Sequence, residues 1–163
     1  MLVYVCYNSR GMSFDYHLDY SSLDFRKRPE LYRVGRGEQG VLLVQPYKRE
    51  IGQYWRFKTP EIARKSAETI WELFSNYLSD GDFVGADMAR KYLQMGWTRA
   101  RRYANHSSGR KYDQDSGELL PLEEDRWSSP KAKAAAIFYQ YYIRARDQPE
   151  YKMLKKVWKK VYG

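Results

Sequence analysis

The sequence has very little cysteine and histidine, and this scarcity excludes several kinds of site. Cys6 is the single cysteine, and His17 and His106 are the only histidines among 163 residues. One cysteine cannot build a disulfide framework within the chain, nor a metal site made of several thiolates. We therefore expect no metal ion and no cofactor. A reducing, cytoplasmic compartment suits such a chain.

Long hydrophobic runs are missing as well. No apolar stretch approaches the ~20 residues that span a bilayer. Residues 1–11 lack the basic start and the small-residue cleavage site of a signal peptide. Met12 precedes a turn-rich stretch and is a plausible start. We expect residues 1–11 to be a leader outside the domain, and residues 12–163 to form a single globular domain.

The basic residues gather in two blocks. The chain has 29 Lys and Arg against 20 Asp and Glu, a net charge of +9. Residues 82–112 hold seven basic and two acidic residues, and residues 131–163 hold nine and two. The segment 113–130 between them is acidic, and its Gly117 and Pro121 are typical of a solvated loop. Two basic blocks favour a polyanionic partner.

Four segments have the periodicity and start signals of helices. The chain is expected to be organised around residues 85–105, where small and apolar residues share one arc behind the N-cap candidate Asp82. Helix-start signals precede the other segments, at Thr59-Pro60, Ser129-Pro130 and Asp147 to Pro149. These patterns predict helices near 60–79, 85–105, 130–146 and 149–162. The run from Ala134 to Ile143 is the most apolar, which predicts the most buried helix.

Residues 32–58 have the composition of strands. Short apolar runs at 32–34 and 41–44 flank the sequence GRGEQG, and an aromatic run follows at 54–58. The GxGxxG match is weak, because a dinucleotide site requires a helix where 41–44 predicts a strand. We interpret the glycines as turn residues with positive φ. The fold class is therefore predicted as α+β: mostly helical, with about four main helices and a small antiparallel sheet or hairpin.

Three stretches resemble a known family. They are YRVGRGEQGVLLVQPYK (32–48), WRFKTPEIA (55–63) and DFVGADMARKYLQMGWTRARRYANH (82–106). They are similar to a family of short, basic, single-domain proteins from bacteria, fungi and tailed phages that is classed as a domain of unknown function. The resemblance implies an intracellular or phage-encoded setting, and it brings no catalytic residue.

Nucleic-acid binding through the phosphate backbone is the function that the charges favour. Arginine offers a planar fork that fits phosphate. Tyr92, Trp97, Tyr103 and Tyr112 interleave with the basic residues, although Trp97 and Tyr103 are expected in the core. The predicted phosphate-binding residues are Arg90, Lys91, Arg99, Arg101, Arg102, His106, Arg110, Lys111, Lys152, Lys155, Lys156, Lys159 and Lys160.

Two alternatives stay open, and the sequence does not decide whether the protein is an enzyme. A small enzyme acting on a nucleotide or phosphorylated substrate would use His106 as acid or base, with Arg99 and Arg102 stabilising charge. A protein-interaction module would instead dock its basic faces on an acidic host partner. The sequence gives neither a preference for DNA or RNA nor an oligomeric state.

Overall fold

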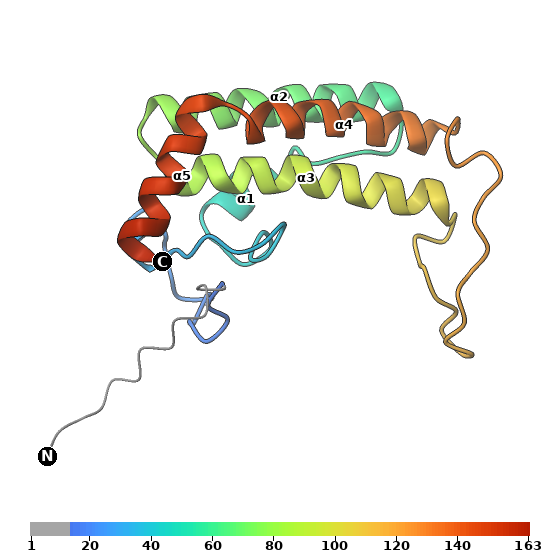
Figure 1. Cartoon of the computed structure of the whole chain (residues 1–163), viewed down its shortest axis with the longest axis horizontal. Coiled ribbons are helices and arrows are strands. Elements are labelled where there is room, and N and C mark those ends of the chain that lie inside the picture. Colours follow the sequence, from blue (N-terminus) through green and yellow to red (C-terminus); the bar gives the residue numbers. More distant parts are fainter. Residues whose placement is uncertain (1–13) are drawn as a thin grey trace, which may run out of the picture.

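The computed structural model describes residues 14–163, and these residues form a helical fold (Figure 1). A short 3-10 helix, η1 (Pro29–Leu31), precedes the α-helices. The α-helices are α1 (Tyr47–Gly52), α2 (Pro60–Ser79), α3 (Phe83–Asn105), α4 (Pro130–Arg146) and α5 (Pro149–Tyr162). The predicted leader, residues 1–11, and the proposed start at Met12 lie outside the described residues.

Helix α3 lies at the centre of the fold. Helices α2 and α4 pack against it and against each other, and both run antiparallel to it (Figure 1). Helix α1 and the chain from residue 14 to 46 cover much of its remaining surface, next to its N-terminal half. Helix α5 crosses near the start of α3, and the loop between α3 and α4 projects from the other end (Figure 1).

The predicted helices are present, and local capping fixes where they begin. Thr59 Oγ1 accepts a hydrogen bond from Ile62 N at 3.2 Å, and Asp82 accepts one from Gly85 N at 3.0 Å. Ser129 and Gln148 cap α4 and α5 in the same way. Each cap satisfies an amide that has no partner within its own helix, so the start of the helix is encoded locally.

The predicted α+β class is wrong, because no strand is present in residues 14–163 apart from an isolated bridge between Tyr112 and Leu119. The strands expected at 32–58 do not form, because side chains of the helices hydrogen-bond to backbone groups that a sheet would need. Ser66 of α2 accepts from Arg56 N at 3.0 Å and donates to Tyr54 O at 2.7 Å. The amides of Gln39, Val41 and Leu43 each bond to the carbonyl three residues back, which forms successive turns instead of a ladder.

The turn interpretation of the GRGEQG sequence is confirmed. Gly37 and Gly40 have φ values of 54° and 82°. Gly40 also has a packing reason, because a Cβ there would stand 2.2 Å from the ring of Phe14. The turns place Val34, Val41 and Val44 in the core, so a segment with strand-like composition serves as a covering loop.

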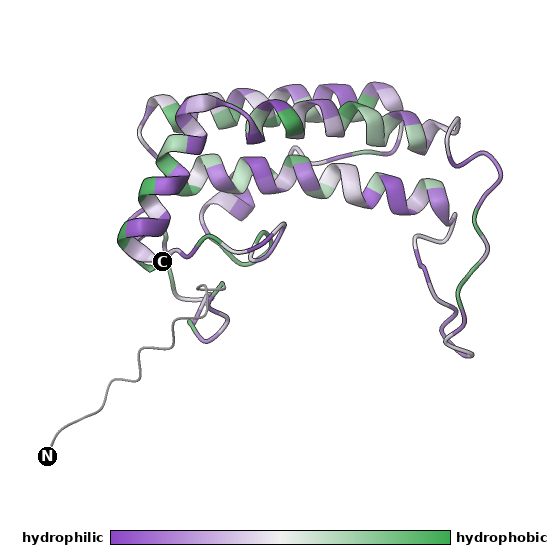
Figure 2. Cartoon of the chain, in the orientation of Figure 1, coloured by the Kyte–Doolittle hydropathy of each residue, from purple (hydrophilic) through white to green (hydrophobic). Residues whose placement is uncertain are grey.

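The most buried helix is α3 and not α4, contrary to the sequence-based expectation. Every residue from Phe83 to Leu93 is buried, whereas Tyr139 and Gln140 in the apolar run of α4 are exposed. Close approach of the two helices depends on Gly96, which lies directly against Phe138 of α4. The central helix also carries hydrophilic residues (Figure 2), and some of them are buried inside the protein. None of the helices in residues 14–163 combines the length and the apolar composition that a membrane-spanning segment needs.

Candidate nucleic-acid interface

The last turns of α3 and the loop that follows them carry a group of cations that we call the arginine end. Arg99 and Arg102 are exposed, and their guanidinium groups make no hydrogen bond or ion pair with any residue of 14–163. Arg101 is half-buried: its Nη2 donates to the carbonyl of Arg126, and its Nε lies 3.3 Å from Asn105 Oδ1. The arginine end comprises Arg99, Arg101, Arg102, Arg110 and Lys111.

Arg110 and Lys111 lie on the loop that leaves α3. Leu120 N donates to Lys111 O at 2.9 Å, and Asp113 N donates to Glu118 O at 2.8 Å. These bonds pair the two sides of the loop around the Tyr112–Leu119 bridge. The side chains of Arg110 and Lys111 remain exposed, so the loop holds two more cations beyond the end of the helix.

Aromatic rings lie among these cations. Trp127 is 73% exposed, and the guanidinium of Arg101 lies 4.5 Å from its ring centroid. Tyr112 is 53% exposed beside Lys111, and Tyr103 is 38% exposed with Lys131 at 5.4 Å from its ring. Exposed rings beside cations offer stacking surfaces next to charge.

The sequence-based choice of aromatics is only partly correct. Tyr112 is exposed, but Tyr92 is buried. Trp97 is partly buried and packs against Tyr139 and Tyr142 of α4, in agreement with its expected place in the core. Tyr103, expected in the core, is more than one-third exposed. Trp127 was missed, although a tryptophan inside an otherwise hydrophilic loop is a recognisable signal.

The acidic loop does not neutralise the arginine end. Asp113 accepts hydrogen bonds from the amides of Asp115 and Ser116, and Glu123 accepts one from Ser107 N at 3.2 Å. Over the described part of the chain, no ion pair joins this loop to α3. The positive charge at the end of α3 therefore faces solvent without an internal counterion.

His106 is the C-cap of α3 and contacts the loop between α3 and α4. It is 5% exposed, and its Nδ1 lies 3.1 Å from the carbonyl oxygen of Pro121. It lines a cavity of about 490 Å³ together with Arg110, Asp113 and Glu123, whereas Arg99 and Arg102 do not line this cavity. The three residues of the enzyme alternative are thus not brought together around one cavity.

Arg90 and Lys91 are buried, although the helical periodicity placed them on the exposed face. They form a buried triad with Asp87: Arg90 Nη2 lies 2.8 Å from Asp87 Oδ1, and Lys91 Nζ lies 3.6 Å from Asp87 Oδ2. Tyr32 and Tyr151 both donate hydroxyl hydrogen bonds to Asp87.

The triad also binds the covering loop. Arg90 Nη1 donates to Gly37 O at 2.9 Å, and Lys91 Nζ donates to Gln39 O at 2.6 Å. Residues 32–41 thereby cover the face of α3 that the sequence pattern assigned to solvent. Arg90 and Lys91 are consequently inaccessible to a phosphate, and we assign them to the fold.

The charges of the triad are set by their contacts. Burial alone would raise the pKa of Asp87, but Arg90, Lys91 and the two tyrosine hydroxyls outweigh it and hold the pKa well below its usual range. Burial lowers the pKa of Lys91 to about 8, although Asp87 opposes that shift. The triad therefore contains a carboxylate whose ionised form is strongly favoured by the fold.

The second predicted basic surface is the lysine face of α5, which consists of Lys152, Lys155, Lys156, Lys159 and Lys160. Lys155 is half-buried over the ring of Tyr151, and the other four are exposed. Tyr151 contacts Asp87 and Arg90 in the first turns of α3, whereas the arginine end begins at Arg99. At 1.5 Å per residue α3 is about 34 Å long, so the two basic surfaces belong to opposite ends of the molecule (Figure 1).

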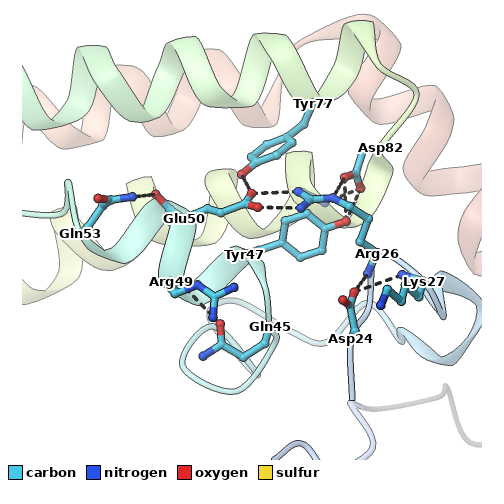
Figure 3. A network of polar contacts seen from close by, with 11 residues as sticks. Asp24, Arg26, Lys27, Gln45, Tyr47, Arg49, Glu50, Gln53, Tyr77 and Asp82 are labelled. Atoms are coloured by element: carbon cyan, nitrogen blue, oxygen red, sulfur yellow. Dashed lines mark hydrogen bonds and ion pairs between the residues drawn. The ribbon is translucent and has the colours of Figure 1, made fainter. Parts of the chain in front are cut away.

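A further polar network ties four segments together near the start of α3 (Figure 3). Arg26 donates to both oxygens of Glu50 at 2.6 and 2.8 Å, and Tyr77 donates to Glu50 at 2.7 Å. Tyr47 donates to Asp82, the N-cap of α3, at 2.6 Å. This network borders a cavity of about 530 Å³ whose other walls include Phe83, Trp158 and Tyr162. Every polar group in it has a partner, so we interpret the network as a structural clamp.

Residues 15–161 match the family described as Domain of unknown function (DUF4385). The match covers most of the chain, which therefore belongs to this family. Neither the curated proteins nor the solved structures include a match to the chain.

Proposed function

We propose that the arginine end binds nucleic acid by contacting the phosphate backbone. The observation that carries this proposal is the group of unneutralised cations around exposed aromatic rings. Arg99, Arg102 and Arg110 have no internal anion among the described residues. Arginine pairs with phosphate in a planar, bidentate geometry, and each such contact releases counterions from the nucleic acid.

The aromatic rings favour a strand with unpaired bases. Trp127 and Tyr112 present open faces beside Arg101 and Lys111. A base that stacks on an exposed ring would place its phosphates within reach of the neighbouring cations. Duplex DNA keeps its bases stacked on each other, so it would use the cations and not the rings.

The arginine end is expected to contribute more than the lysine face. Arg99, Arg101 and Arg102 lie on α3, which packs against both α2 and α4, so the backbone that carries them is held in place before binding. Helix α5, which carries the lysines, packs less extensively on the rest of the fold. The two surfaces also lie at opposite ends of the protein, so the lysine face does not extend the arginine site.

The test is fluorescence anisotropy with single-stranded and duplex oligonucleotides across a salt series. If about five phosphates of duplex DNA are contacted, log affinity falls against log salt with a slope near −4 to −5. Arg99→Glu/Arg102→Glu should weaken binding of all sequences alike. Lys156→Glu/Lys160→Glu changes the net charge by the same amount at the other end and is the matched control. The proposal fails if the wild type binds neither strand form at low salt, or if the control variant loses as much affinity.

A further inference from the structure

Helix α5 presents an apolar ridge to solvent. Met153, Val157 and Val161 are 61%, 52% and 63% exposed. They follow one another at intervals of four residues, so they form one continuous line along the helix. Hydrophobic and hydrophilic residues alternate along this helix (Figure 2). Single exposed apolar residues are ordinary, but an aligned set on one short helix is a surface that can be covered.

The ridge cannot turn inward, because the other side of α5 is fixed. Tyr151 donates to Asp87 at 2.5 Å, and Trp158 Nε1 donates to the carbonyl of Tyr32 at 3.0 Å. The Trp158 ring also packs on Phe83 with centroids 5.0 Å apart. These contacts set the rotation of α5 about its own axis and leave the ridge outside the core.

Lysines border the ridge on one side. Lys156 and Lys160 each follow a ridge residue by three positions, so they are its neighbours on the helix surface. Glu150 is the only acidic residue of α5. In residues 14–163, the lysines of this helix make no ion pair. The surface thus combines exposed aliphatic groups with positive charge that has no internal counterion.

We propose that this face of α5 docks an acidic amphipathic helix of a partner protein. The aliphatic side chains of such a helix would cover Met153, Val157 and Val161, and its carboxylates would reach Lys156 and Lys160. Burial of the ridge contributes to the affinity, and the lysine charges favour an acidic partner and raise the rate of association.

Other occupants fit this surface less well. A phosphate backbone is charged and offers no aliphatic face to cover the ridge. A second copy packed ridge to ridge would bring lysines against lysines. Helices that bind a lipid surface usually insert tryptophan, phenylalanine or leucine side chains into it, but Trp158 and Leu154 of α5 pack against the core. Charge complementarity therefore selects an acidic protein helix.

The probe for this proposal is a designed helical peptide with leucines every three or four residues and glutamates beside them. It is titrated against the full chain by anisotropy and compared with a scrambled peptide of equal composition. Met153→Gln/Val157→Gln removes the ridge while keeping good helix formers, and Lys156→Glu/Lys160→Glu reverses the charge. We expect each double variant to weaken binding of the designed helix about tenfold or more. Arg99→Glu/Arg102→Glu should leave it unchanged.

Several outcomes would overturn the proposal. They are the absence of binding at submillimolar peptide, equal binding of the scrambled peptide, and full binding by Met153→Gln/Val157→Gln. Vesicles of phosphatidylcholine and phosphatidylserine, and sedimentation of the chain alone, probe the two main competitors. Ridge-dependent binding to the vesicles, or ridge-dependent self-association, without peptide binding would assign the surface to lipid or to a second copy.

Discussion

Tyr151 of α5 donates a 2.5 Å hydrogen bond to Asp87, a carboxylate that lies fully buried in the first turns of α3. The same carboxylate accepts from Tyr32 and contacts Arg90 and Lys91. One acidic residue therefore joins the last helix, the central helix and the covering loop 32–41. It also balances part of the charge of the buried cations Arg90 and Lys91.

Asp87→Asn is expected to destabilise the protein by about 3–5 kcal/mol, because it leaves two buried cations without their counterion. The measurement is the free energy of unfolding in urea. Asp80→Asn is the control, since Asp80 is exposed and should tolerate the change. Equal stability of the Asp87→Asn variant and the wild type would refute the structural role of the triad.

Acid should remove the contribution of Asp87. Its folded-state pKa is depressed, so the stabilisation is complete above the unfolded value of about 3.9 and is lost as pH falls toward the folded value. The stability difference between wild type and Asp87→Asn should therefore shrink below about pH 4. Urea unfolding at several values between pH 2 and pH 7 measures this difference, and a constant difference would contradict the assignment.

Gly96→Ala is expected to destabilise the protein even though alanine is the better helix former. A Cβ at Gly96 would stand 2.2 Å from a ring carbon of Phe138, and such overpacking typically costs about 1–3 kcal/mol. Phe138→Leu removes the ring, so Gly96→Ala should cost less in that background. A double-mutant cycle from chemical denaturation measures the coupling, and additive effects would show that the helices separate without strain.

Trp127→Ala should weaken binding of single strands more than binding of duplexes, because only unpaired bases can stack on the exposed ring. Stacking contributes about 1–3 kcal/mol per base, so a loss of this order is expected for single strands. Both affinities are measured by anisotropy at one salt concentration. Tyr16→Ala is the control, because Tyr16 is another exposed ring and is not part of the arginine end. An equal loss of affinity for single strands and for duplexes would show that Trp127 does not stack on bases.

Helix positions followed well from the sequence because their signals are local. The prolines and capping residues at 59–60, 129–130 and 148–149 act within one turn, and the structure begins α2, α4 and α5 at those prolines. Four residues that the sequence offered as phosphate-binding are exposed in the structure, because charged side chains at a helix end and in the following loop are seldom covered: Arg99, Arg102, Arg110 and Lys111.

The wrong predictions concern segments whose neighbours are distant in sequence. Residues 54–58 have strand-like composition, but Ser66 of α2 bonds to the carbonyl of Tyr54 and the amide of Arg56. Arg90 and Lys91 occupy the polar arc of α3, yet residues 32–41 fold over that arc and supply carbonyl partners. Periodicity defines the sides of a helix, and it cannot tell which side another segment will cover.

The amino-acid sequence by itself determined the four long helices, the starting residues of α2, α4 and α5, and the two blocks of positive charge, whereas α3 begins at Phe83, two residues before the predicted start. It did so because capping and helical periodicity act between residues close in the chain. Only the tertiary structure decided that α3 is covered on its polar arc and that the arginine end and the lysine face lie at opposite ends of the protein. It also decided that Met153, Val157 and Val161 stay outside the core, because burial depends on which segments meet after the chain has folded.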